Sequence, residues 1–510
     1  MKWATGVLLG AVLAIGACQL FLPERFAVNV PVAHMLFGMG ADGPVESDFD
    51  SEAADGARIR AAEGFSISIF ASGIPNARFL RPTPSGALLV SQPRSGTILM
   101  LEPDLDGDGR SDGRSTLLEG LNRPHGIDIH DGWLYVAEGD AIGRVRVDDF
   151  SASAEQLAAG YERIVDGLPS GGNHWSRTVR VGPDGWLYVT VGSSCNVCED
   201  PPRRAAMLRF RLDGSDEEIY ASGLRNSVGF DWRPGTGELF ATDNGRDLLG
   251  DDFPPCELNR IVRGGFYGWP YVNGDGVIDP DLGDAAPDRV RDSIPLVHGF
   301  RAHNAPLGIT FIRSDAVPAD YRGAALVALH GSWNRSKKDG YKVVSLHWDA
   351  AGRIEERDFA VGFERDDDVV GRPVDVAEGS DGAFYISDDF AGAVYRVVVS
   401  ANAASPARAV DHSELRTRDV VEPAAPADNA AEALAARRGA ELYGRFECAS
   451  CHEPARAAAG VVAVELVDLP ARYSSYDLAS YLATPTPPMP VFPMSATERR
   501  DLAVFLLGRR

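Results

Sequence analysis

The chain has 510 residues, 45% of them hydrophobic, and a formal net charge of −23. That length accommodates one large domain and one small domain, and the hydrophobic content is ordinary for a chain that folds. A surface with this much negative charge repels nucleic acid and anionic lipid. Nucleic acid is therefore not expected as a partner.

Residues 1–25 are predicted to be a signal or membrane-anchor helix. Lys2 precedes an apolar run from Trp3 to Leu22, which is about long enough to cross a bilayer. Cys18 follows a sequence that resembles a lipoprotein cleavage box, whereas the apolar residues beyond it favour an uncleaved helix. A buried core helix is the third alternative. We expect an anchor that places the chain on the periplasmic side of the bacterial inner membrane.

A mixed, partly acidic spacer is expected over residues 26–60, followed by a β-rich domain over 61–400. Six turn glycines in that domain each precede a strand-like apolar run; they are Gly86, Gly132, Gly185, Gly237, Gly323 and Gly382. Six such units predict a six-bladed β-propeller, with a β-sandwich or a β-helix as the alternative. Residues 401–432 are rich in Ala, Pro and charge and are predicted to be a linker.

A loop near the start of the β-rich domain resembles the beginning of an EF-hand calcium loop. Its carboxylates are Asp104, Asp106, Asp108 and Asp112. Position 12 of the motif is Ser115 rather than Glu, so a turn without metal is the alternative. If Ca²⁺ binds here, we expect its role to be structural.

Three further cysteines, Cys195, Cys198 and Cys256, lie in the β-rich domain. An oxidising compartment favours a disulfide, which leaves one of the three unpaired, and the sequence does not say which.

Residues 433–510 are predicted to be a small all-α cytochrome c domain. Cys448-Ala-Ser-Cys451-His452 has the spacing that attaches haem to two thiols and gives the iron an axial histidine. Met489 is predicted as the second axial ligand, with Met494 as its rival. Helices are expected from about Ala430 to Phe446 and again after Ser495. The alternatives, a redox dithiol and a zinc site, do not explain His452 and the downstream methionine. The segment resembles small class I cytochromes c.

The β-rich domain also contains a series of short polar motifs. They are Arg123-Pro-His-Gly126, Gly172-Asn-His-Trp-Ser176, Gly223-Leu-Arg-Asn226, Asp243-Asn-Gly245, Glu257-Leu-Asn259, Gly264-Gly-Phe-Tyr-Gly-Trp-Pro270, Ala305-Pro-Leu-Gly308 and Gly331-Ser-Trp-Asn-Arg335. In this order they resemble the soluble quinoprotein glucose/sorbosone dehydrogenases, and the sorbosone branch most closely. The resemblance implies pyrroloquinoline quinone (PQQ), Ca²⁺ and oxidation of an aldose.

Residue roles follow from this resemblance. His174 is the expected general base and Arg225 the residue that stabilises developing charge. The expected PQQ ligands are Arg225, Asn226, Arg335, Arg372 and His125. Lys337 and Lys338 are possible substitutes for these cations, and a core position is the alternative for His125. The backbone carbonyls of Gly245 and Arg246 are expected to bind the catalytic Ca²⁺.

Together these features predict a quinohaemoprotein oxidoreductase. It would oxidise a sugar or a sugar-derived aldehyde or lactol and pass electrons to haem c, and from there to an external cytochrome or the quinone pool. The alternatives are a propeller lactonase without quinone and a non-catalytic binding propeller, each carrying an appended cytochrome.

Overall fold

The computed structural model describes residues 57–400 apart from 149 and 151, and residues 410–411. In the C-terminal part it describes 429–446, 448–453, 466, 469, 473, 478–479, 481–482, 492, 494 and 496–508. The chain divides into two compact units, Met1–Thr417 and Arg418–Arg510. The boundary falls inside the segment predicted as a linker. The predicted anchor lies outside the described residues, and no described helix is both long and apolar enough to span a membrane.

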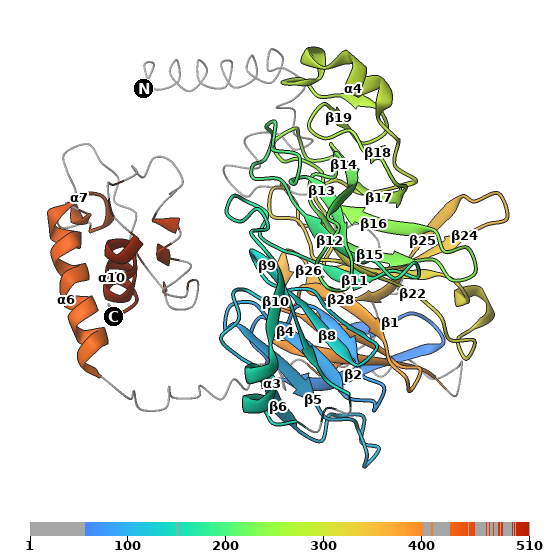
Figure 1. Ribbon diagram of the computed structural model, residues 1–510, viewed down its shortest axis with the longest axis horizontal. Helices are drawn as coiled ribbons and strands as arrows, with labels where there is room; N and C mark the ends of the chain where they lie inside the picture. Colours follow the sequence, from blue (N-terminus) through green and yellow to red (C-terminus); the bar gives the residue numbers. More distant parts are fainter. Residues whose placement is uncertain are drawn as a thin grey trace, which may run out of the picture. The chain divides into compact units, whose positions relative to one another are not determined.

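Six sheets of four or more strands form the first unit, so the predicted six-bladed β-propeller is confirmed (Figure 1). The first three sheets follow the chain in order. Sheet one contains β3 (Leu80–Pro82), β4 (Leu88–Gln92), β5 (Thr97–Leu101) and β6 (Arg114–Leu118). Sheet two contains β7 (Ile127–His130), β8 (Trp133–Ala137), β9 (Ala141–Arg146) and β10 (Glu162–Asp166). Sheet three contains β11 (Val179–Val181), β12 (Leu187–Val191), β13 (Ala206–Phe210), β14 (Glu218–Ser222) and β18 (Gly265–Phe266).

The remaining three sheets complete the ring. Sheet four contains β15 (Ser227–Trp232), β16 (Leu239–Asp243), β17 (Cys256–Ile261) and β21 (His298–Phe300). Sheet five contains β22 (Pro306–Phe311), β23 (Ala325–Leu329), β24 (Lys342–Trp348), β25 (Ile354–Val361), β1 (Ala57–Ala61) and β31 (Val410–Asp411). Sheet six contains β28 (Pro373–Glu378), β29 (Phe384–Asp388), β30 (Ala393–Val399) and β2 (Phe65–Ser72).

Short hairpins and helices lie in the connections between the blade strands. Two small hairpins are formed by β19 (Val272–Asn273) with β20 (Val277–Ile278) and by β26 (Glu364–Arg365) with β27 (Asp368–Val369). Among the described residues of this unit, the helices are α3 (Ala154–Gly160), α4 (Pro287–Asp292), η2 (Gly283–Ala285) and η3 (Ala319–Tyr321). Ser153 and Gln156 form a capping box that starts α3.

The last blade closes the ring by joining the two ends of the propeller sequence. Strand β2 pairs antiparallel with β30, from Phe65 opposite Val399 to Ser72 opposite Ala393. This pairing holds together segments more than 300 residues apart, so closure depends on tertiary contacts. Strand β1 begins at Ala57, inside the predicted spacer, because it pairs with β25 and β31.

The six turn glycines lie in the hairpins that join the first and second strands of the six blades. All six have positive φ, between 69° at Gly237 and 89° at Gly86. Side chains are disfavoured in that conformation, which explains the recurrent glycine. The second strands β4, β12, β16, β23 and β29 are buried along their whole length. They lie between neighbouring blades, and most of their residues are apolar.

Buried carboxylates join the first strands of neighbouring blades. Asp128 accepts from the backbone N–H of Val181 at 2.7 Å, and Asp231 accepts from that of Phe311 at 2.8 Å. Asp375 accepts from that of Leu80 at 2.9 Å, across the junction between the sixth and first blades. Each bond satisfies a backbone donor that a strand edge would otherwise leave unpaired.

The second unit contains α6 (Asn429–Arg445), α7 (Ala449–His452) and α10 (Ala496–Leu507). Helices α6 and α10 pack closely at Gly439, where a Cβ would lie 2.1 Å from the carbonyl oxygen of Asp501. Arg438 and Asp501 form a bidentate ion pair, with contacts of 2.6 and 2.9 Å, beside this crossing. The two helices agree with the two expected from the sequence.

Candidate active site

The first strands of neighbouring blades contact one another in the pairs β3–β7, β7–β11, β15–β22, β22–β28 and β28–β3, and β15 contacts β12 of the third blade. Segments that lead into these strands therefore converge at one end of the propeller. His125, His174, Arg225, Asn226 and Arg372 all lie in such segments. Because the strands of a blade are antiparallel, the loops between second and third strands reach the same end. Those loops carry Gly245, Arg246 and Arg335.

His174 is held by the backbone of the β12–β13 loop. Its Nδ1 lies 2.9 Å from the carbonyl oxygen of Ser193 and 2.8 Å from that residue's hydroxyl. A carbonyl only accepts, so Nδ1 carries the hydrogen and Nε2 presents a lone pair. Burial, reinforced by the positive charge of Arg225, lowers the pKa of His174 to about 3. The imidazole is therefore neutral at physiological pH.

Arg225 is buried against two loops. Its Nη1 donates to the carbonyl oxygens of Asn244 at 3.1 Å and Gly245 at 2.8 Å. Its Nε and Nη2 donate to Asn196, and Nη2 also lies 3.3 Å from Asp247. Burial lowers the pKa of Arg225, although the neighbouring carboxylates oppose this. The guanidinium thus lies against a carbonyl predicted to bind Ca²⁺.

Asn226 lies beside His174, and Gly192 makes this proximity possible. A Cβ on Gly192 would lie 2.6 Å from Cβ of His174 and 2.8 Å from Oδ1 of Asn226. The buried Oδ1 of Asn226 has no hydrogen-bond partner among the described residues. A buried acceptor without a partner is costly, which is consistent with a ligand-facing amide.

Arg372 and Arg335 have different surroundings. Arg372 donates from Nε to the carbonyl oxygen of His330 at 3.0 Å and from Nη2 to that of Gly331 at 2.9 Å. Arg335 donates to the carbonyl oxygen of Asp251 and lies 3.1 Å from the carboxylate of Asp252. Arg335 is therefore already neutralised, whereas no ion pair to Arg372 occurs within the described part of the chain.

Arg246 has its side chain engaged in two ion pairs. Its guanidinium pairs with Asp279 at 2.6 Å and with Asp281 at 3.0 Å. This anchors the β16–β17 loop and leaves only backbone atoms of Arg246 for a metal.

His125 is completely buried. It packs against Phe79 and Trp175, with ring centroids 4.4 and 5.4 Å away, and Nδ1 lies 3.2 Å from the carbonyl oxygen of Arg177. Burial and nearby arginines lower its pKa well below the usual value. Its Nε2 is buried without a hydrogen-bond partner among the described residues, so the predicted ligand role of His125 and its core alternative both stay predictions.

A buried ion-pair cluster at the same end was not anticipated from the sequence. Asp389 accepts from Arg78 at 2.7 Å and lies 2.8 Å from Nε2 of His330. Burial lowers the pKa of His330 to about 4, against the opposing effect of Asp389. Arg78 precedes β3, His330 follows β23 and Asp389 follows β29. Each residue is therefore far in sequence from the other two. Their common position at strand ends is the signal that could have identified them.

The predicted EF-hand-like loop lies at the opposite end, between β5 and β6. Carboxylate oxygens of Asp104, Asp106 and Asp108 can all lie within 4.8 Å of one another. Asp104 accepts from the backbone N–H groups of Gly107 and Gly109, and Asp112 accepts from that of Leu105. These bonds stabilise the turn by themselves, so Ca²⁺ binding here stays a prediction.

The cysteine pairing left open by the sequence is resolved in the structure. Cys195 and Cys198 form a disulfide, and Cys256 is a buried free thiol. Burial raises the pKa of the Cys256 thiol.

The haem motif lies at the start of α7. Cys448 is buried, and the backbone N–H of His452 donates to its carbonyl oxygen at 3.1 Å, one helical turn away. Met494 packs into the core of this unit with Leu442, Leu482 and Leu502. Met489 lies outside the described residues, as does the side chain of Cys451.

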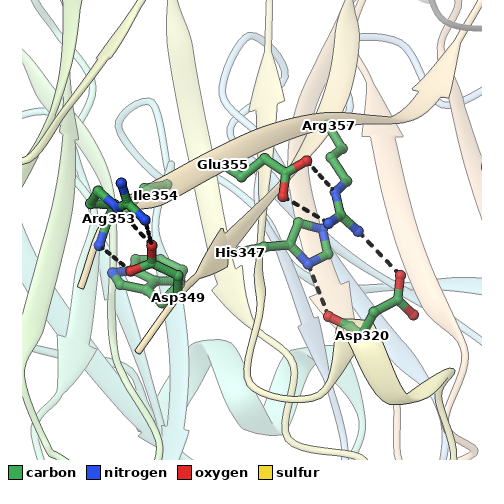
Figure 2. Close-up of a pocket in the computed structure, with 8 residues that line it drawn as sticks. Asp320, His347, Asp349, Arg353, Ile354, Glu355 and Arg357 are labelled. Carbon is green, nitrogen blue, oxygen red and sulfur yellow. Dashed lines mark hydrogen bonds and ion pairs between the residues drawn. The ribbon is translucent and has the colours of Figure 1, made fainter. Parts of the chain in front are cut away.

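A charged surface pocket at the far end of the fifth blade is separate from this site (Figure 2). It surrounds the β24–β25 hairpin, where Arg353 pairs with Asp349 at 2.7 Å. Arg357 pairs with Glu355 at 2.7 Å and with Asp320 at 3.2 Å. Both of its arginines are paired with carboxylates, and it contains none of the predicted site residues.

Fold and site define a β-propeller with a site at one end of its axis that contains a neutral histidine and several arginines. Residues 131–396 match the family model described as Glucose / Sorbosone dehydrogenase, and the chain belongs to that family.

Three curated proteins illustrate the relationship. An uncharacterized protein of Borreliella burgdorferi is 36% identical over 293 residues, which cover 55% of this chain and 77% of that protein. Quinoprotein glucose dehydrogenase B of Acinetobacter calcoaceticus is 31% identical over 144 residues, 22% of this chain and 29% of that enzyme. Cytochrome c-552 of Bradyrhizobium diazoefficiens is 38% identical over 99 residues, 19% of this chain and 94% of that protein.

Solved structures share the fold. The PQQ domain of pyranose dehydrogenase from Coprinopsis cinerea, in its holo form, superposes with a TM-score of 0.56 at 21% identity, covering 67% of this chain and 97% of that one. A Trichoderma reesei protein of carbohydrate-active enzyme family AA12, described as a calcium structure, gives 0.56 at 21% identity, covering 69% and 100%.

Proposed function

We propose that the chain is a quinohaemoprotein dehydrogenase. Its propeller oxidises a sugar or a sugar-derived aldehyde or lactol with PQQ and Ca²⁺, and a c-type haem in the second unit carries electrons to an external cytochrome or the quinone pool. Family membership supports an oxidoreductase, and two relatives are named for PQQ or quinoprotein sugar oxidation. A sorbosone-type substrate and a periplasmic, membrane-anchored location belong to this proposal as predictions from the sequence.

The single observation that carries the proposal is the orientation of His174. Its Nδ1 is fixed on the Ser193 carbonyl, so the lone pair of Nε2 is available, and Nε2 has no hydrogen-bond partner among the described residues. Its low pKa keeps the ring unprotonated, as a general base must be before it accepts a substrate hydroxyl proton. Arg225 is close enough to influence that pKa, so its charge also favours a negative substrate oxygen.

The residues present fit PQQ, which carries three carboxylates and a quinone. Arg225, Asn226 and Arg372 would hold it, because the Asn226 amide oxygen lacks a partner and Arg372 donates only to carbonyls. Arg335 would first have to release Asp252, and His125 is too deeply buried to touch a ligand without rearrangement. When bound, the quinone supplies a two-electron acceptor, and Ca²⁺ on the Gly245 and Arg246 carbonyls would polarise it.

The C-terminal unit is proposed to bind haem through Cys448 and Cys451, with His452 and Met489 as axial ligands. The motif and the similarity to a cytochrome c-552 support this assignment. Two thiols one helical turn apart match the two vinyl groups to which haem c is attached.

Dye reduction tests the proposal directly. Apoprotein should be inactive with sugars until PQQ and Ca²⁺ are both added. Full activity without quinone would instead indicate a lactonase or other hydrolase, and binding without turnover a non-catalytic propeller. A chain ending at Thr417 keeps β31 paired with β1 and should reduce small dyes normally. It should fail to reduce a protein acceptor.

A further inference from the structure

A short loop between β12 and β13 contacts both residues that the proposed function makes catalytic. The loop, Ser193–Cys198, is closed by the Cys195–Cys198 disulfide. At its start, the Ser193 carbonyl and hydroxyl lie 2.9 and 2.8 Å from Nδ1 of His174. At its middle, the Asn196 carbonyl and side-chain oxygen accept from Arg225 at 3.0 and 2.9 Å.

The loop also fixes the backbone on either side of these residues. The N–H of Asn173 donates to the carbonyl oxygen of Ser194 at 2.8 Å. On the other side, Asn196 and Asp247 form a reciprocal pair: Asn196 Oδ1 accepts from the Asp247 N–H at 2.8 Å, and Asn196 Nδ2 donates to the Asp247 carbonyl at 3.1 Å. The loop thus connects the third and fourth blades at the site.

The disulfide encloses the residue that makes these contacts. Asn196 lies between the two cysteines, and the Ser193 hydroxyl also donates to the Cys195 carbonyl at 2.8 Å. Closing so short a loop adds little to the stability of the whole propeller, because the gain in loop-closure entropy grows with loop length. Its main physical effect is to restrict the conformation of Asn196 inside the ring and of the Cys195 carbonyl that accepts from Ser193.

We infer that the disulfide-closed Ser193–Cys198 loop is the positioning element of the active site, in which Ser193 sets the tautomer of His174 and Asn196 holds Arg225 and Asp247. This inference rests on the proposed function for its catalytic consequence. Its structural consequence stands independently of that function.

The first experiment replaces both cysteines with serine in the full-length holoprotein. Peptide mapping without reductant should show the Cys195–Cys198 cross-link in the wild type. In the double variant, hydrogen exchange at residues 193–196 should rise while the unfolding midpoint changes little. With PQQ and Ca²⁺ present, kcat should fall by roughly tenfold or more, as expected for displaced catalytic groups.

The second experiment isolates Asn196. Asn196→Ala should lower kcat by roughly tenfold or more, with a smaller change in KM, because it removes the side-chain bond to Arg225 and both side-chain bonds to the Asp247 backbone. In the cysteine double variant, Asn196→Ala should cost much less, because residues that act as one unit are non-additive. Asn122→Ala is the matched control, since its side chain contacts Asp140 and none of the loop.

If the loop has no role in positioning the catalytic residues, the kinetic results should differ. Wild-type kcat and unchanged exchange at 193–196 in the cysteine variant would overturn the inference, as would fully additive effects with Asn196→Ala. If the wild type shows no PQQ-dependent turnover, the proposed function fails instead. In that case hydrogen exchange still decides whether the disulfide orders the loop.

Discussion

Arg225 donates from Nη1 to the carbonyl oxygen of Gly245 at 2.8 Å, so a guanidinium occupies an oxygen that the sequence assigns to Ca²⁺. Two cations cannot share this oxygen without repulsion. The positive charge of Arg225 should therefore weaken Ca²⁺ binding at this oxygen.

The first prediction follows from this competition. Arg225→Ala should strengthen Ca²⁺ binding by the apoprotein in the absence of PQQ, because a competing cation is removed. The same variant should weaken PQQ retention. Calorimetric titration of Ca²⁺ measures the first effect, with Asp104→Asn and Asp106→Asn introduced to suppress the predicted second site. Arg353→Ala, which removes an equal charge at the opposite end, should leave both affinities unchanged.

The second prediction concerns pH. The pKa of His174 in the folded protein, about 3, lies below the 6.5 of an unperturbed histidine, so as pH falls the unfolded chain takes up a proton that the folded chain does not. The contribution of His174 should destabilise the fold as pH falls from about 6.5 towards 3. In ¹⁵N spectra, His174 should remain a neutral Nδ1–H tautomer at pH 5. A titration of the His174 ring near pH 6.5 would contradict the geometry.

Replacing the same residue tests its catalytic role. His174→Ala should lower kcat by roughly 10²–10⁴-fold, as expected when a general base is lost.

The third prediction tests the close approach at Gly192. Gly192→Ala should displace His174 and Asn226, because the added Cβ would lie within 3 Å of both. Turnover should fall sharply, while Gly444→Ala, whose added Cβ meets no atom within 4 Å, should leave it unchanged. Steady-state kinetics of the two variants provides the comparison, and equal turnover would show that the site tolerates the methyl group.

The fourth prediction separates two arginines that the sequence treats alike. Arg372→Ala should weaken PQQ retention by about 1.5–3 kcal/mol, the value of a charge-assisted hydrogen bond. Arg335→Ala should weaken it less, because its guanidinium is engaged by Asp251 and Asp252. Equilibrium binding of PQQ at fixed Ca²⁺ measures both, and the reverse order would reassign the ligands.

The fifth prediction concerns haem. Cys448→Ala together with Cys451→Ala should abolish covalent haem on a denaturing gel after expression with a cytochrome c maturation system. Met489→Ala should remove the iron–sulfur absorption and lower the potential. Met494→Ala should preserve that absorption, since Met494 packs in the helical core. The opposite pattern would make Met494 the ligand.

The sequence by itself determined the repeating part of this protein. Positive-φ glycines such as Gly132 and Gly382 recur where a turn joins the first and second strands of a blade, and strands buried on both faces are mostly apolar. Both constraints are local, so they can be recognised in the chain. Cys448-Ala-Ser-Cys451-His452 is equally local, because one helical turn fixes its spacing.

Only the tertiary structure decided which side chains meet. Asp389, His330 and Arg78 come from three different blades. The sequence around each residue does not indicate that the other two are its neighbours in the fold. The sequence also left the cysteine pairing open and could not show that Arg225 turns towards Gly245 and Asn196. Such contacts depend on how the closed ring brings loops together, a long-range property that sequence spacing does not encode.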